Sequence, residues 1–180
     1  LGKRWQFEVA IQHYSLNWSF CHLATPDISF VLRIHSLCNR EKICIFSLTI
    51  KAHAKAAEFF KVPESTQLSC LERLRGCPEY PFVRFISYFN PVIPITGVEN
   101  LAIPLYEMLQ TNFGIIVKTS RERISAMAAD DLLAQKLEIK PGDPVLVRER
   151  FVLDVSDRPV EYNIGYYRAD SFTYSIEFTN

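Results

Sequence analysis

Residues 131–151 read DLLAQKLEIKPGDPVLVRERF and are followed at 159–170 by PVEYNIGYYRAD, and this stretch decides the fold. A similar order occurs earlier in the chain, where residues 54–75 read AKAAEFFKVPESTQLSCLERLR and residues 81–91 read PFVRFISYFNP. Several residues agree when the two stretches are aligned: Val62 with Ile139, Glu72 with Glu149, Arg73 with Arg150, Pro81 with Pro159, Ile86 with Ile164 and Tyr88 with Tyr166. The sequence therefore predicts an internal duplication.

Each copy has the pattern of a short helix, a turn, a strand, a second turn and a returning strand. In the second copy KPGDP ends the helix and VSDRP makes the hairpin turn. The apolar stripe expected of this helix consists of Ala126, Leu132, Leu133 and Leu137. The strand that follows places on one face the residues Val145, Val147, Phe151 and Leu153. Two such units side by side predict an α+β fold, an antiparallel β-sheet with the helices of both units on one face.

The last strand pattern, between residues 159 and 178, has two different faces. Its even-numbered residues are apolar or aromatic: Val160, Tyr162, Ile164, Tyr166, Phe172, Tyr174, Ile176 and Phe178. Burying such a side chain is worth roughly 1.5–3 kcal/mol, so the even face is expected in the core. The odd face carries Glu161, Asn163 and Tyr167. It is either a solvated surface or one wall of a pocket.

The rest of the chain supplies further elements of the same domain. Residues 28–36 and 42–50 have the composition of strands, and Pro104 begins a helix that Gly114 ends. Residues 1–27 are left unassigned, although one more strand is favoured by the alternation of Trp5, Phe7, Val9 and Ile11. A length of 180 residues with 48% hydrophobic composition fits one domain with a sizeable core.

The overall charge argues against two classes of partner. Twenty basic residues balance 20 acidic ones, so the chain lacks the positive excess that binds nucleic acid or an anionic membrane. Its apolar runs end well short of the roughly 20 residues that span a bilayer. An odd number of cysteines without C-x-x-C spacing argues against disulfides and zinc, and we expect them to be buried: Cys21, Cys38, Cys44, Cys70 and Cys77. These features predict a cytoplasmic, soluble protein.

Common catalytic and cofactor motifs are missing. The sequence contains no G-x-S-x-G, H-E-x-x-H, Walker A or G-x-G-x-x-G. The histidines lack metal-ligand spacing and are expected to be structural or on the surface: His13, His22, His35 and His53. The sequence thus predicts no metal, no cofactor and no catalytic residue.

Two arginine pairs carry the clearest chemical signal. Arg73 and Arg75 are two apart on a predicted strand and so share a face, and Arg148 and Arg150 repeat this arrangement in the second copy. Two guanidinium groups at this spacing can hold a phosphate or a carboxylate through charge-assisted hydrogen bonds. The alternative is a solvated sheet face with cross-strand ion pairs, for instance to Glu161.

Three parts of the sequence together carry a family resemblance. The run AAEFFKV followed by LERLR, the helix PLYEML and the block PVLVRERFVLDVSDRPVEYNIGYYRADSFTY resemble the UTRA domain, the effector-binding half of HutC-subfamily GntR transcription regulators. The resemblance covers residues 28–178 and divides the chain into an N-terminal segment, 1–27, and a UTRA-like effector-binding and dimerisation domain, 28–180. It implies a chorismate lyase-like fold, a ligand sensor rather than an enzyme, a small anionic effector, and a homodimer. It also implies that DNA binding belongs to a winged helix-turn-helix domain absent from this sequence.

The resemblance also implies roles for single residues. Arg73 and Arg75 would hold the anionic end of the effector, Tyr106 would assist them, and Glu161 and Tyr167 would address its polar end. These roles favour a pocket wall over a solvated surface for the odd face of the last strand.

One departure from the family pattern bears on the effector. Sugar-phosphate sensors of the family have Ser-Leu-Tyr where this chain has Pro104-Leu105-Tyr106, and proline offers neither a hydroxyl nor an N–H to a phosphate. Anion recognition is therefore more firmly implied than phosphate recognition. Two alternatives stay open: a small chorismate lyase-like enzyme that uses the same pocket, and an oligomerisation module without a ligand.

Overall fold

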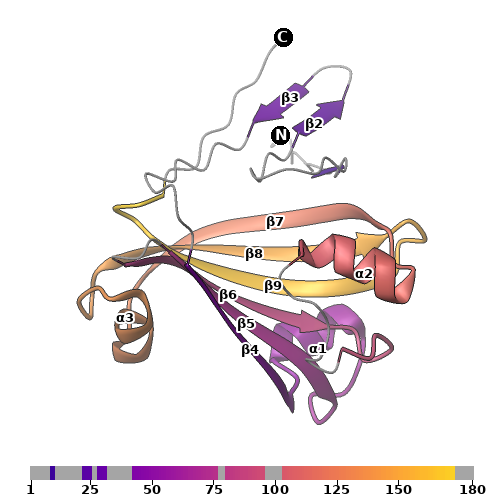
Figure 1. Cartoon of the computed structure of the whole chain (residues 1–180), viewed down its shortest axis with the longest axis horizontal. Coiled ribbons are helices and arrows are strands. Elements are labelled where there is room, and N and C mark those ends of the chain that lie inside the picture. The colour runs from indigo at the N-terminus through magenta and orange to yellow at the C-terminus, as the bar shows by residue number, and fades with distance from the viewer. Residues whose placement is uncertain are drawn as a thin grey trace, which may run out of the picture.

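We analysed a computed structural model of the chain, which describes residues 9–10, 22–25, 28–31, 42–76, 80–95 and 103–172. The strands are β1 (Val9–Ala10), β2 (His22–Thr25), β3 (Ile28–Val31), β4 (Lys42–Lys51), β5 (Gln67–Gly76), β6 (Pro81–Phe89), β7 (Val117–Ala128), β8 (Pro144–Asp154) and β9 (Pro159–Arg168). The helices are α1 (Ala54–Phe60), α2 (Leu105–Phe113) and α3 (Asp131–Leu137). Figure 1 shows their arrangement in space.

The main sheet has seven antiparallel strands in the order β1-β7-β8-β9-β6-β5-β4. This order is nearly symmetric about its centre, where β6 and β9 pair through Ile86 and Ile164. On one side the chain runs β4-α1-β5-β6, and on the other it runs β7-α3-β8-β9. The predicted internal duplication is confirmed, and each unit includes one strand before its helix.

The helices of the two units, α1 and α3, cover the same face of the sheet (Figure 1). Helix α1 packs Ala56 and Phe60 against residues of β5, β6, β8 and β9, and α3 packs Leu133 and Leu137 against Val145 at the other end of that face. Helix α3 starts at Asp130, whose side chain accepts a hydrogen bond from the Leu133 N–H at 2.7 Å. This bond satisfies one of the donors that every helix start leaves unpaired. Because α1 and α3 pack on one face of an antiparallel sheet, the α+β prediction is confirmed.

Two details of the predicted second unit are wrong. Ala126 belongs to β7 rather than to the helix, and Leu132 is 55% exposed instead of lying in the apolar stripe. Strand β7 itself was not predicted. Its residues from Arg121 to Ala128 are mostly exposed, so they do not show the regular alternation that burial of one face imposes on a strand.

Helix α2 lies on the opposite face of the sheet and connects the two units (Figure 1). Its buried residues Leu105, Met108 and Leu109 pack against Leu71 and Phe89, which belong to β5 and β6. As predicted, Pro104 directly precedes the helix, and Gly114 ends it in the left-handed conformation with φ 66°.

The remaining predictions have mixed outcomes. Residues 42–50 form a strand as expected, and part of 28–36 does so as β3. Val160, Tyr162 and Ile164 on the even face of β9 are buried, as is Cys70. The following predicted core residues lie outside the described part of the chain: Trp5, Phe7, Ile11, Tyr174, Ile176 and Phe178. Among the described residues, no helix combines the length and the apolar character needed to cross a membrane.

Candidate functional site

The odd face of β9 is buried, like its even face. Glu161 is 1% exposed, Asn163 4% and Tyr167 1%. A carboxylate, an amide and a phenol rarely reach such burial without partners, because each loses its contacts with water. The alternative of a plain solvated surface is therefore wrong for this face.

The strand register brings both arginine pairs onto this same face. Arg73 lies opposite Phe85, Phe85 opposite Gly165, and Gly165 opposite Arg148, which places the two arginines in one row across four strands. Because side chains alternate along a strand, Arg75 and Arg150 point to the same side as their neighbours in each pair. We call this side, which carries Arg73, Arg75, Arg148, Arg150, Glu161 and Tyr167, the arginine face.

At one end of the arginine face, helix α2 contacts a buried carboxylate. The hydroxyl of Tyr106, in the first turn of α2, donates a hydrogen bond to Oε2 of Glu161 at 2.8 Å. Burial raises the pKa of Tyr106 well above its usual value, and the Glu161 carboxylate raises it further. The phenol therefore stays protonated as the donor, and this hydrogen bond links α2 to strand β9.

Arg73 lies on β5, two strands away from Glu161, in an environment that is costly for a cation. Its guanidinium lies 5.7 Å from the ring centre of Phe85. Burial lowers the pKa of Arg73, and the negative charge of Glu161 offsets part of this effect. The Nε atom of Arg73 is buried and has no hydrogen-bond partner among the described residues.

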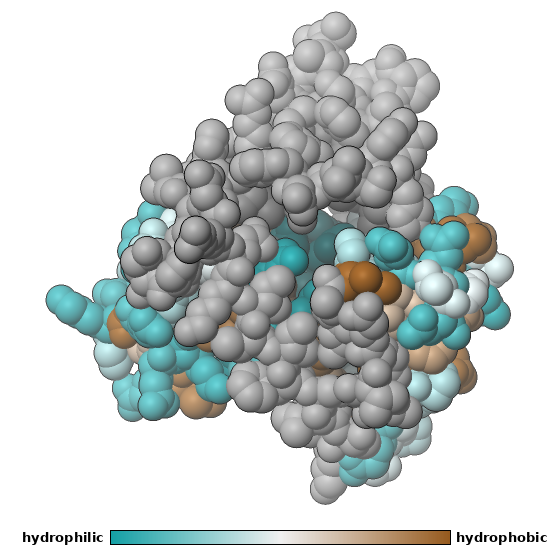
Figure 2. Space-filling model, viewed as in Figure 1, coloured by the Kyte–Doolittle hydropathy of each residue, from teal (hydrophilic) through white to brown (hydrophobic). Residues whose placement is uncertain are grey.

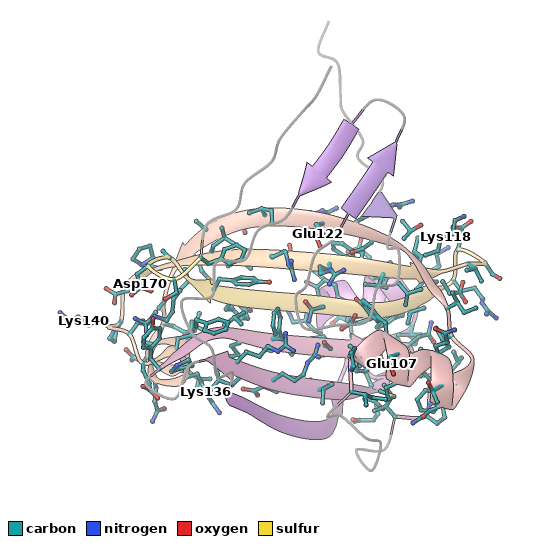
Figure 3. The ribbon with its side chains drawn as sticks, turned by 45° about the horizontal axis from the view of Figure 1, so that its top comes forward. Glu107, Lys118, Glu122, Lys136, Lys140 and Asp170 are labelled. Atoms are coloured by element: carbon teal, nitrogen blue, oxygen red, sulfur yellow. The ribbon has the colours of Figure 1, made fainter. Side chains whose placement is uncertain are left out.

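The centre of the arginine face is more completely paired. Nε of Arg150 lies 3.0 Å from Oε1 of Glu122 and donates to Oγ of Ser120 at 3.1 Å. Beside it, the Asn163 amide donates to Oγ of Ser87 at 3.0 Å. Figure 3 shows Glu122 near the middle of β7. The outer strand β7 thus supplies the counter-ion for one of the four arginines.

The side of the arginine face formed by β8 and the end of β9 has buried polar atoms that lack a partner among the described residues. Arg148 is 6% exposed, and its nearest carboxylate oxygen is Oε1 of Glu122, 3.9 Å from Nη1. Its Nε atom and the hydroxyl of Tyr167 are both buried without a hydrogen-bond partner in the described part of the chain. The guanidinium of Arg148 lies 5.4 Å from the ring centre of Tyr167, so the two unpaired groups are neighbours.

Within the part of the chain that the structure describes, the arginine face therefore carries more arginines than carboxylates. Its four arginines face two carboxylates, those of Glu122 and Glu161, within the residues that the structure describes. A buried donor without a partner in the described ranges, such as Nε of Arg148, is destabilising, and an acceptor supplied from solution would relieve this cost. In the space-filling view, hydrophilic residues lie at the centre of the molecule beside α2 (Figure 2).

The other face of the sheet provides a contrast, because its charged groups are paired. Lys55 donates to Glu149 at 2.7 Å, and the Tyr162 hydroxyl donates to the same carboxylate. Burial alone would raise the pKa of Glu149, but these two hydrogen bonds lower it below its usual value. Arg84 donates to Glu72 at 2.9 Å. No group of three or more His, Cys, Asp or Glu residues in the described ranges is arranged to hold a metal ion.

The structure brings all five predicted site residues to the arginine face. Arg73, Arg75, Glu161 and Tyr167 lie on its strands, and Tyr106 reaches it from α2. Their role in ligand binding stays a prediction. Arg148 and Arg150 were recognised as a pair in the sequence but not included in the site.

Two further polar residues of the face, Ser120 and Glu122, could not be found from the sequence. They lie on β7, and the strand pattern of β7 is too weak to show which residues point inward. The hydrogen bonds and ion pairs of Arg150 identify them only once β7 is placed beside β8.

Solved structures of GntR-family regulators are similar to this chain. The ligand-binding domain of a proposed GntR-family transcriptional regulator from Bordetella bronchiseptica has a TM-score of 0.72 and 22% identity, covering 82% of this chain and 96% of that one. A GntR-family regulator from Bacillus cereus has a TM-score of 0.69 and 20% identity, covering 77% and 99%. These likenesses confirm the expected fold, a chorismate lyase-like antiparallel sheet flanked by helices.

Sequence comparison gives the family. A curated relative from Escherichia coli K12, the HTH-type transcriptional regulator GgaR, is 27% identical over 128 residues, which cover 71% of this chain and 51% of the relative. The chain thus spans about half the length of the curated relatives that it matches. The UTRA domain family matches residues 45–173, which is most of the described sheet and all three helices. The chain belongs to the UTRA domain family.

Proposed function

We propose that this chain is the ligand-sensing domain of a bacterial GntR-type transcriptional regulator and that its effector is a small anion bound at the arginine face. The observation that carries the proposal is a set of buried donors on that face, Nε of Arg73, Nε of Arg148 and the hydroxyl of Tyr167, which have no hydrogen-bond partner among the described residues. An anionic group from solution would supply hydrogen-bond acceptors for these donors. Arg73 and Arg75 would hold this group, and Glu161 and Tyr167 would accept or donate hydrogen bonds to the rest of the effector.

Helix α2 is the element that would transmit binding. Tyr106 joins α2 to Glu161, and Glu161 interacts electrostatically with Arg73. An anion beside Arg73 would compete with the Glu161 carboxylate for that cation. The attraction between Arg73 and Glu161 would then be weaker, and the hydrogen-bonded pair of Glu161 and Tyr106 could move. An allosteric signal requires two conformations of the protein that differ in affinity for the effector. Here the two conformations would differ in the position of α2.

Several parts of the proposal rest on the family and the relatives. We propose that a winged helix-turn-helix domain reads DNA, that the regulator belongs to the HutC subfamily, and that it acts in the cytoplasm as a homodimer. The GgaR relatives are HTH-type transcriptional regulators, and the match to this chain covers only 51% of their length, which supports a separate DNA-binding domain. Light scattering of the purified chain tests the homodimer, since the mass is 20.8 kDa for one copy.

A thermal-shift screen tests the effector proposal. Small carboxylic acids and phosphate esters are added to the chain at constant ionic strength, and the melting temperature is measured for wild type and for Arg73→Ala/Arg75→Ala. A ligand present at 100 times its Kd stabilises the native state by about 2.7 kcal/mol. We expect at least one acid to raise the wild-type melting temperature and to have no effect on the variant. Equal stabilisation of both proteins would contradict the assignment of the arginines.

The enzyme alternative is tested with the same preparation. A small lyase on this fold would hold a carboxylate with an arginine and move a proton with a glutamate, for which Glu161 is the candidate. Turnover of chorismate by the wild-type chain, lost in Glu161→Gln, would favour the enzyme. Binding of an acid without turnover favours the sensor.

A further inference from the structure

We propose that Arg148 and Tyr167 form a second acid-binding subsite on the arginine face, so that the effector carries two acidic groups joined by an apolar linker. This inference rests on the proposed function, because it describes the ligand of the same face. It assigns a binding role to Arg148 and a specific partner to the Tyr167 hydroxyl.

The first argument is the unmet hydrogen-bonding capacity at this end of the face. Arg148 is only 6% exposed, and its only ion pair within the described residues is the long one to Glu122, with 3.9 Å between Nη1 and Oε1. Glu122 lies closer to Arg150, at 3.0 Å, so it neutralises that arginine first. The buried Nε of Arg148 and the buried hydroxyl of Tyr167 have no partner within the described residues.

The second argument is the chemistry of the two groups. A guanidinium donates hydrogen bonds and carries a positive charge, and a phenol donates one further hydrogen bond. Burial raises the pKa of Tyr167, while Arg148 beside it acts in the opposite direction, so the phenol is a protonated donor at neutral pH. A cation and a neutral donor next to each other suit a carboxylate or a phosphate oxygen, whereas they do not suit a cation or an apolar group.

The third argument is the spacing from the first subsite. Arg73 and Arg148 lie in one row, separated by three strand spacings, which is about 14 Å between the two backbones. One acid group is too small to contact both arginines across this width unless their side chains converge on it completely. A ligand with two acidic groups uses both ends, and each arginine then acts separately.

The surface between the two subsites is apolar, which limits the linker. The rings of Phe85 and Tyr167 meet edge to face at 5.7 Å above Gly165. A Cβ atom at Gly165 would lie 2.8 Å from Cε2 of Tyr167 and 3.1 Å from Cε1 of Phe85, so the rings fill the space that a side chain would need. Atoms that cross from one subsite to the other pass over aromatic carbon, which favours a hydrocarbon linker over a polar one.

The experiment compares diacids with monoacids of equal chain length. Unbranched dicarboxylates from malonate to adipate and the corresponding monocarboxylates are titrated into the chain by calorimetry at constant ionic strength. In wild type, we expect at least one diacid to bind more tightly than its monoacid. One charge-assisted hydrogen bond contributes about 1.5–3 kcal/mol, so the preference should be roughly tenfold or more.

Arg148→Met should remove this preference by lowering diacid affinity to the level of the monoacid, while monoacid affinity stays unchanged. Tyr167→Phe should lower diacid affinity by about two- to tenfold, as expected for one neutral hydrogen bond. Arg148→Lys keeps the charge and serves as the folded control, with circular dichroism to verify all variants. Arg73→Met should weaken diacids and monoacids together.

The outcomes separate this inference from the proposed function. Acid binding that depends on Arg73 but keeps its diacid preference in Arg148→Met would overturn the second subsite and leave the sensor proposal standing. Binding of monoacids and diacids with equal affinity in wild type would also overturn the second subsite. Binding of no acid at all would overturn the anionic-sensor proposal, and the second subsite would fall with it.

Discussion

The hydrogen bond between Tyr106 and Glu161 gives the sharpest stability prediction. Tyr106→Phe removes one hydroxyl and leaves a buried carboxylate, 1% exposed, without its 2.8 Å donor. A hydrogen bond to a charged group contributes about 1.5–3 kcal/mol, and we expect a loss in this range because water has little access to Glu161. In a chain of this size, each kcal/mol of lost stability lowers the melting temperature by about 2–4 °C, so we expect a decrease of roughly 3–12 °C.

Urea denaturation at neutral pH measures this loss as a difference in the free energy of unfolding. Tyr166→Phe is the matched control, because the described residues provide no hydrogen-bond partner for that hydroxyl, and it should change the stability by less than about 0.5 kcal/mol. A double-mutant cycle with Glu161→Met isolates the pair and should give a coupling energy of about 1–3 kcal/mol. Equal losses in Tyr106→Phe and Tyr166→Phe, or a coupling energy near zero, would refute the role given to this bond.

Two further substitutions test the frame of the site. Burial alone would raise the pKa of Asp154, but hydrogen bonds from the backbone and side chain of Arg158 lower it, so its stabilising effect is present above the ordinary carboxyl pKa and is lost as the pH falls through the lowered value. Asp154→Asn should therefore destabilise the chain by about 1.5–3 kcal/mol at neutral pH, and the difference from wild type should shrink in acid urea titrations. Gly165→Ala places a Cβ 2.8 Å from the Tyr167 ring and should cost about 1–3 kcal/mol in the same assay. Ser125→Ala, an exposed strand position, should cost less than about 0.5 kcal/mol, and equal effects at positions 165 and 125 would contradict the close packing of that ring.

The duplication is the part of the fold that the sequence predicted best. Alignment of LERLR with RERFV and the alternation in Pro159–Arg168 are local patterns, and both come from strands that are buried between neighbouring strands and helices. The same reasoning failed for β7. Most of its residues are exposed, so its sequence lacks the alternation of apolar and polar residues that a buried face produces. Ala126 was assigned to a helix for this reason.

The candidate site was only partly predictable for a related reason. Spacing along a strand indicates which side chains share a face, and it grouped Arg73 with Arg75 and Arg148 with Arg150. Spacing does not indicate which strands are adjacent. The row from Arg73 to Arg148 depends on the pairing of β6 with β9, a contact between the two units that turn patterns do not encode.

The central claim is that Arg148 on the arginine face is a buried cation that has no close counter-ion among the described residues. Its most direct test is the free energy of unfolding of Arg148→Met without added ligand. Glu122 keeps Arg150 at 3.0 Å in this variant, so no carboxylate loses its nearest cation. The account predicts that the unliganded variant is as stable as wild type or more stable, since replacing a buried, poorly paired charge with an apolar side chain removes a desolvation cost. A loss of about 3–5 kcal/mol, the usual cost of breaking a structural buried ion pair, would contradict it.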